Sequence, residues 1–352
     1  MVNIYNNIIA DNQEVSRVWL YIANFIIIIN LISSPYLDLS IHLFFIVIGM
    51  FVVSSATTSK FNFVSKIASL TSAFGTILIV SSALMYKEDI IINKFFSIYN
   101  NLFYIVGLAL FLAGVLIQSL VLIIDKFNFC LKNFAHITIA IIIIFAVLSV
   151  FITFYLLKST LIGNIAFDHQ EFYQIIFCSF NNILNFFFIQ LFIMCVIYIF
   201  EEYLLKKKVF NQSEINIFAL LNLLAVISSF SSFFLYKVNS SYFINFYYFH
   251  QKIFSGIVLG MFLFRIIFIA VFNYKEYDSK IKKTLLLGIL CFVFVLAHQL
   301  SSDFVLIKKL LYYASVKPLP IIYLAFISSK IIFIILCIRF LRKNNDKKIK
   351  TN

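Results

Sequence analysis

The residues best suited to binding a metal or taking part in a reaction are the five histidines, which are His42, His136, His169, His250 and His298. No two of them are three or four residues apart, so no single helix presents a pair of imidazoles to one ion. His42, His250 and His298 fall in apolar stretches, where imidazoles from two helices could clamp a heme iron. The alternative is a lone histidine that is hydrogen-bonded to a neighbouring helix.

Two charged residues lie deep within apolar stretches, Arg265 and Lys330. A charge at the centre of a membrane helix costs at least about 2.5–3.5 kcal/mol, so such residues usually face a cavity or a partner. They could contact heme propionates or bind an anionic substrate. Lys252 lies nearer a helix start and can extend its ammonium group to the membrane surface. Few carboxylates lie in the apolar stretches to balance these charges.

Other chemical patterns are weaker. The run Asp168-His-Gln-Glu171 places three metal-binding side chains together, either as a metal site or as a solvated loop. The five cysteines show no CxxC spacing, which argues against a disulfide framework or a zinc site. Gln190 is one polar residue among phenylalanines, and a hydroxyl on a neighbouring helix would explain it. The sequence contains no P-loop, nucleophile elbow, HExxH motif or dinucleotide-binding glycine motif.

Composition places these residues in a membrane. The chain has 352 residues, of which 62% are hydrophobic and 12% charged, with a mean hydropathy of +1.01. A soluble protein of this size needs a far more polar surface. We therefore expect an all-α, polytopic membrane protein whose main partner is the lipid bilayer. The net charge of +13 does not indicate nucleic-acid binding, because the basic residues lie between and after the apolar stretches.

About ten membrane-spanning helices are expected, each near the length needed to cross a bilayer. They lie near residues 18–34, 40–58, 67–86, 102–124, 134–157, 172–200, 215–236, 246–272, 284–301 and 319–341. Residues 1–17 form a polar tail without the features of a cleavable signal peptide. Residues 18–341 form one transmembrane domain, and residues 342–352 form a basic tail.

Lysine and arginine counts predict the orientation. One side of the membrane receives 18 of these residues and the other receives 7. Because the more basic side is normally cytoplasmic, both termini are expected there. Gly107 and Gly114 should share one helix face, and the spacing of Gly256 and Gly260 would let another helix approach closely.

Four segments resemble the heme–copper oxidase subunit I family, in a short bacterial branch. Tyr173–Phe186 is similar to the metal-binding sixth helix, and Tyr99–Gln118 is similar to the fourth helix. Tyr36-Leu-Asp-Leu-Ser40 looks like the start of the second helix. Val316–Ile322 looks like the start of the helix that carries two paired heme ligands. The resemblance implies an oxidase-like helical bundle across residues 36–330.

The same resemblance implies that the metal ligands have been replaced. Asn182 stands where the family has a copper-binding histidine, and Tyr36 stands where a histidine binds the low-spin heme. Pro320 and Ile322 stand at the two remaining heme-ligand positions that can be placed. An amide is a poor copper ligand, and proline and isoleucine offer none. Oxygen reduction by the family mechanism is therefore not expected.

These observations leave three functional hypotheses. The leading one is a degenerate relative of the oxidase subunit, without catalytic residues or a bound cofactor. It would have a structural or accessory role beside a respiratory complex of the bacterial inner membrane. The second is a small-molecule or ion transporter with Arg265 and Lys330 along its path. The third is an electron-transfer or sensor protein that keeps a heme on non-standard ligands, drawn from Tyr36, His42, His250 and His298.

Overall fold

The structure is a computed structural model that describes most of residues 15–272. The described residues are 15–26, 46–54, 57, 59–85, 90–91, 98–99, 101–126, 134–161, 169–199, 201 and 208–272. The chain divides into two compact units, residues 1–265 and 266–352. Of the second unit, only the final turns of one helix, residues 266–272, are described.

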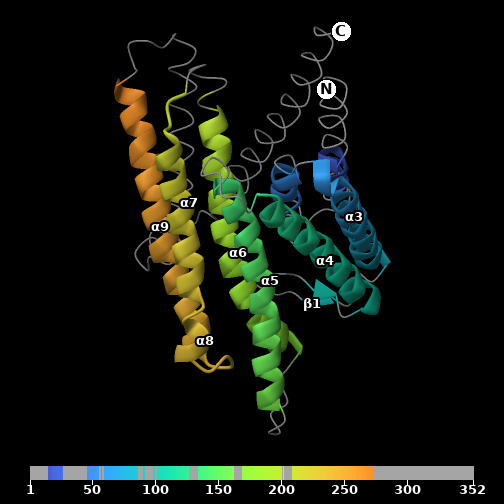
Figure 1. The fold of residues 1–352 in the computed structure, drawn as a ribbon. Coiled ribbons are helices and arrows are strands. Elements are labelled where there is room, and N and C mark those ends of the chain that lie inside the picture. The colour runs from blue at the N-terminus through green and yellow to red at the C-terminus, as the bar shows by residue number, and fades with distance from the viewer. Residues whose placement is uncertain are drawn as a thin grey trace, which may run out of the picture. The chain divides into compact units, whose positions relative to one another are not determined.

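The described part is helical except for one pair of two-residue strands (Figure 1). Its elements are η1 (Ser59–Phe61), α3 (Asn62–Met85), β1 (Ile90–Ile91), β2 (Ile98–Tyr99), α4 (Leu102–Asp125), α5 (Phe134–Leu161), α6 (His169–Ile199), α7 (Gln212–Ser229), α8 (Ser232–Leu235) and α9 (Ser241–Phe272). Residues 15–26 and 46–54 are also helical. β1 and β2 pair in antiparallel fashion, with Ile90 opposite Tyr99.

Six apolar segments in this part are long enough to cross a membrane. They are Asn62–Ser82, Leu102–Asp125, Phe134–Leu157, Ile175–Met194, Gln212–Leu235 and Ser241–Ile269. A helix suits that environment because it satisfies its own backbone donors and acceptors, which lipid cannot do. The expectation of an all-α membrane protein is confirmed at this level. The helices expected at 284–301 and 319–341 lie outside the described residues.

The predicted helix starts agree with the structure at some helices and differ at others. The helices expected at 102–124 and 134–157 begin at Leu102 and Phe134 as predicted. Those expected at 67–86 and 246–272 begin five residues earlier, at Asn62 and Ser241. Apolar residues mark only the part of a helix that hydrocarbon surrounds, whereas backbone hydrogen bonding continues into its polar ends.

The single helix expected at 215–236 is interrupted by a turn at residues 230–231, between α7 and α8. Serine hydroxyls near the turn bond to carbonyls three residues earlier. Ser228 donates to Ala225 O at 2.9 Å, and Ser231 donates to Ser228 O at 2.7 Å. Hydroxyls that bond back to the helix in this way often bend it. The apolar pattern continues through the turn and does not reveal it.

α3 and α4 make the most extensive contact between described helices, and glycines allow it. A Cβ atom added to Gly75 would lie 2.5 Å from Phe111 N. One added to Gly114 would collide with Ala68 O. Ser72 also donates a hydrogen bond across the interface to Phe111 O at 3.0 Å. Small residues therefore bring the two backbones together, as expected for helices packed in a membrane.

Among the other described helices, α5 contacts α4, α6 and α7, while α6 also contacts α7. α6 supplies much of the core, including the fully buried rings of Phe186 and Phe187. Gly260 on α9 behaves differently from the α4 glycines. A Cβ atom added there would meet no atom within 4 Å. The predicted close approach of another helix at Gly260 is therefore not found among the described residues.

Alanine substitutions at two glycines should have opposite effects. We predict that Gly75→Ala destabilises the protein by about 1–3 kcal/mol, the usual effect of overpacking, because backbone atoms must move aside. Gly260→Ala should leave stability unchanged or raise it by up to about 1 kcal/mol, because alanine favours helix more than glycine does. Thermal unfolding of both variants in the same detergent would measure the difference. Equal effects at the two sites would contradict the described α3–α4 packing.

Candidate functional site

The polar side chains of α7 and α8 join this segment to both of its neighbours. Three pairs connect it to α9, namely Glu214 with Arg265, Ser228 with His250, and Ser232 with Tyr247. A fourth pair, Gln190 with Asn222, connects α6 to α7. Residue numbers rise along α7 and α8 while those of the partners fall along α9, so the two segments run antiparallel. The three pairs are spread over roughly 27 Å of helix, at 1.5 Å per residue.

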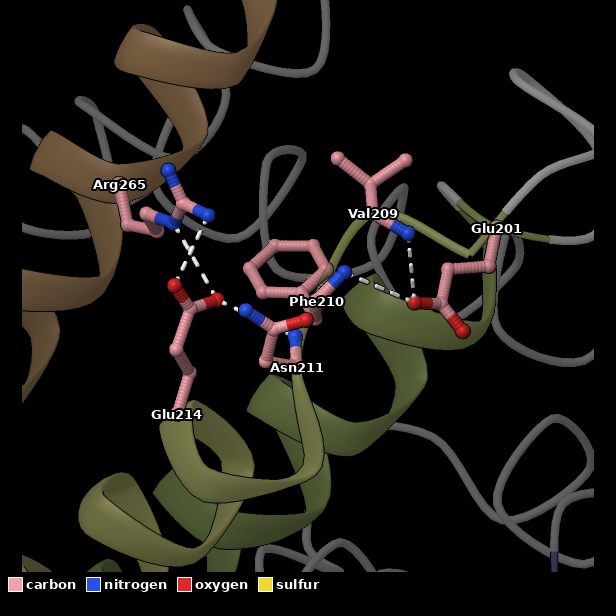
Figure 2. A network of polar contacts seen from close by, with 6 residues as sticks. All are labelled: Glu201, Val209, Phe210, Asn211, Glu214 and Arg265. Carbon is pink, nitrogen blue, oxygen red and sulfur yellow. Dashed lines mark hydrogen bonds and ion pairs between the residues drawn. The ribbon is translucent and has the colours of Figure 1, made fainter.

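The strongest of these contacts is the ion pair of Arg265 with Glu214 (Figure 2). Arg265 Nη2 lies 2.8 Å from Glu214 Oε1, and Arg265 Nε donates to Glu214 Oε2 at 3.3 Å. Each side chain retains only 28% of its accessible surface. The two contacts form the side-by-side geometry that a guanidinium group makes with a carboxylate.

Glu214 also organises the start of α7. Asn211 is the N-cap residue, and its backbone N–H donates to Glu214 Oε2 at 3.3 Å, which completes a capping box. A carboxylate is favourable there because the first helical turn carries unpaired N–H groups. Glu201 plays a related role before the helix, since its Oε1 accepts from Val209 N and Phe210 N, both at 3.0 Å. The contacts of Glu214 and Glu201 thereby connect the start of α7 to α9 and to the residues that follow α6.

An aromatic layer lies beneath this polar end. The ring of Phe262, three residues before Arg265, has its centre 5.3 Å from that of Phe218 and 6.0 Å from that of Phe210. All three side chains are buried. We call Phe210, Phe218 and Phe262 the aromatic layer. It separates the ion pair from the Gln190–Asn222 pair farther along α7.

The ion pair corrects one expectation about Arg265. The apolar stretches contain few carboxylates that could balance an intramembrane charge, and Glu214 lies just outside the helix predicted at 215–236. Because α7 begins at Gln212, Glu214 lies within its first turn and reaches Arg265. The Asn211-x-x-Glu214 spacing is a capping-box pattern and would have revealed this carboxylate. Lys330 lies outside the described residues.

His250 is the one candidate heme ligand that the structure describes. Its Nε2 lies 2.8 Å from Ser228 Oγ, and which atom donates depends on the tautomer. The ring stacks on Phe254 with centres 4.5 Å apart, and it also contacts the rings of Phe246 and Phe186. The expectation that an intramembrane histidine bonds to a neighbouring helix is confirmed at this position. Tyr36, His42 and His298 lie outside the described residues.

The described residues around the Ser228–His250 contact do not provide the other groups that a hydrolase site needs. The Ser228 hydroxyl donates to the Ala225 carbonyl, and the nearby amides of Phe230 and Ser231 donate to Ile227 O and Ser228 O. A nucleophilic serine also needs free donors that can stabilise an oxyanion. Among the described groups beside this pair, the backbone donors are already used. The contact therefore acts as a link between helices.

Asn182, at the copper-ligand position suggested by the resemblance, is buried within α6. Its Nδ2 donates to the Cys178 carbonyl at 2.9 Å and lies 3.9 Å from the Cys178 sulfur. Its Oδ1 has no hydrogen-bond partner. The amide donor is thus used within its own helix. Tyr36, Pro320 and Ile322, the other positions at which the resemblance implies a replaced ligand, lie outside the described residues.

Gln190 and Asn222 form an amide pair in the core. Asn222 Nδ2 donates to Gln190 Oε1 at 2.8 Å, and both side chains are fully buried. A hydroxyl partner was expected for Gln190, and that expectation is wrong because the partner is an amide. Gln190 Nε2 and Asn222 Oδ1 remain without hydrogen-bond partners. An asparagine within an apolar stretch is the sequence signal that could have identified Asn222.

Metal-binding potential is limited within the described ranges. No group of three His, Cys, Asp or Glu side chains there is arranged to hold an ion. The Asp168-His-Gln-Glu171 hypothesis is not tested, because Asp168 and the side chains of the next three residues are not described.

No family model, curated protein or solved structure matches this chain.

A double-mutant cycle would measure the contribution of the ion pair. Arg265→Gln and Glu214→Gln should each lower the unfolding free energy, and together they should reveal a coupling of about 1 kcal/mol, allowing for solvent screening of a partly exposed pair. Glutamine at position 214 retains a capping-box acceptor, so the cycle isolates the charge interaction.

Lys237→Gln is the matched control, because Lys237 is exposed outside the transmembrane helices. It should leave unfolding unchanged. Strictly additive effects of Arg265→Gln and Glu214→Gln would show that the ion pair does not join α9 to α7.

Proposed function

We propose that this protein is a degenerate relative of heme–copper oxidase subunit I with a structural or accessory role. In this proposal it forms a bundle of about ten helices in the bacterial inner membrane, with both termini in the cytoplasm. Its bundle contacts, or assists in assembling, a respiratory complex. It performs no oxygen chemistry of its own.

The main support for this proposal is that His250 is already hydrogen-bonded to a neighbouring helix. A histidine ligand presents one ring nitrogen to a metal, and its other nitrogen is usually held by a hydrogen bond. Nε2 of His250 is bonded to Ser228, and three phenylalanine rings surround the imidazole. Heme ligation through Nε2 would require this contact to break. The other polar pairs of α7 and α8 have the same function of joining helices.

Asn182 supports the same proposal. Copper favours imidazole nitrogen, and a neutral carboxamide is a poor substitute. The nitrogen of this side chain donates to Cys178 O, and the oxygen is the only atom left to face an ion. Glutamine, asparagine and serine in membrane helices commonly bond across or along helices, which suits a packing role.

Transport is the second candidate, and the amide pair is the observation that favours it. Gln190 Nε2 and Asn222 Oδ1 are polar atoms in the bundle core without partners. Polar groups at such depth often mark the path of a solute. In this alternative Arg265 closes one end through Glu214, whereas the sequence had suggested that it binds substrate directly.

A visible absorption spectrum with iron and copper analysis tests the proposal. The protein purified in mild detergent should show no Soret band and no stoichiometric iron or copper, because its ligand positions are replaced. A Soret band with one iron per chain would overturn the cofactor-free account, and His250→Phe would then show whether His250 is a ligand.

Affinity purification from native membranes tests the accessory role. Subunits of a respiratory oxidase should copurify with the tagged protein at a constant ratio. Their absence, together with solute uptake that is lost in Arg265→Ala, would favour transport.

A further inference from the structure

We propose that Gln190 and Asn222 form an internal binding site for one small neutral molecule that both accepts and donates a hydrogen bond. The occupant is water or the hydroxyl or amide group of a small solute. This site is additional to the accessory role proposed above and does not depend on it.

The hydrogen bonding of the pair defines the site. The bond between Asn222 Nδ2 and Gln190 Oε1 uses one atom of each carboxamide. The atoms left over are a donor, Gln190 Nε2, and an acceptor, Asn222 Oδ1. Each belongs to a carboxamide that is already joined to the other. A molecule that accepts from Nε2 and donates to Oδ1 would satisfy both remaining atoms and connect the two side chains a second time.

Burial makes such an occupant favourable. Both side chains have no accessible surface. A buried polar atom without a partner costs about 1–3 kcal/mol, and the low dielectric of the core adds to this cost. Buried waters typically make two to four hydrogen bonds to polar groups that otherwise lack them. The two unpartnered amide atoms provide two of those bonds.

The charge distribution of α7 favours a neutral occupant. The charged residue of α7, Glu214, lies eight residues before Asn222, which is roughly 12 Å along a helix. It is already neutralised by Arg265. A carboxamide offers only partial charges, and these do not compensate an ion for the loss of its hydration.

The aromatic layer closes one side of the site. Phe218 lies four residues, or one helical turn, before Asn222, and its ring packs edge-on against Phe262. Beyond it the Glu214–Arg265 pair joins the same two helices. A molecule that reaches the amide pair from this end must displace both the aromatic layer and the ion pair. An occupant at this depth should consequently exchange slowly with the solution on that side.

Solid-state NMR of the full chain in lipid bilayers tests the site directly. With ¹⁵N in the glutamine side chains, the Gln190 signal is identified by its loss in Gln190→Leu. We expect magnetisation transfer to this signal from water, or a saturable shift when acetamide or glycerol is added. Transfer from water without an effect of either solute assigns the site to water. A saturable shift assigns it to a small solute.

Absence of both effects in the wild-type protein would overturn the proposal. Asn222→Leu should remove the effect by deleting the acceptor, whereas Asn216→Leu, which changes another amide of α7, should preserve it. The wild-type measurement decides the question even if Asn222→Leu does not fold. A Soret band or a missing respiratory partner would refute the accessory role while leaving this site unaffected.

Discussion

One constraint governs the described bundle, which is that a polar group among apolar helices is costly unless it has a partner within the protein. Lipid offers no hydrogen bonds and solvates charges poorly. Arg265 shows the consequence most clearly. Its guanidinium group is matched by Glu214, which also caps the start of α7. A single carboxylate thus stabilises one helix end and binds a second helix, and Glu201 holds the chain that leads into that end.

The same constraint accounts for the contacts deeper in the bundle. Ser228 bonds to His250, Ser232 donates to Tyr247, and the amides of Asn222 and Gln190 pair with each other. Interhelical hydrogen bonds in membranes contribute about 0.6 kcal/mol of stability on average, so each one is weak. Several of them at fixed positions along two helices together determine how the helices align. They fix the register of α7 and α8 against α9 and hold α7 against α6. α3 and α4 pack in a different way, because their glycines permit direct contact between the two backbones.

The sequence predicted the membrane class and several helices correctly because long apolar stretches have few alternatives in a folded protein. It failed at details that depend on tertiary partners. The turn after Ser229 is hidden because the apolar pattern continues across it. The pairing of Glu214 with Arg265 is hard to predict because the two residues are 51 positions apart and the apolar stretch begins only after Glu214. The amide partner of Gln190 likewise required knowledge of which helix lies beside α6.

If the polar side chains between α7, α8 and α9 serve to join these helices, the Ser228–His250 contact must contribute to the stability of the protein. The measurement is a double-mutant cycle of unfolding free energies with Ser228→Ala and His250→Phe, in which phenylalanine suits the aromatic surroundings of position 250. We expect a coupling near 0.6 kcal/mol, within the range found for membrane helices. Additive effects, with no coupling beyond experimental error, would show that the contact does not join the two helices.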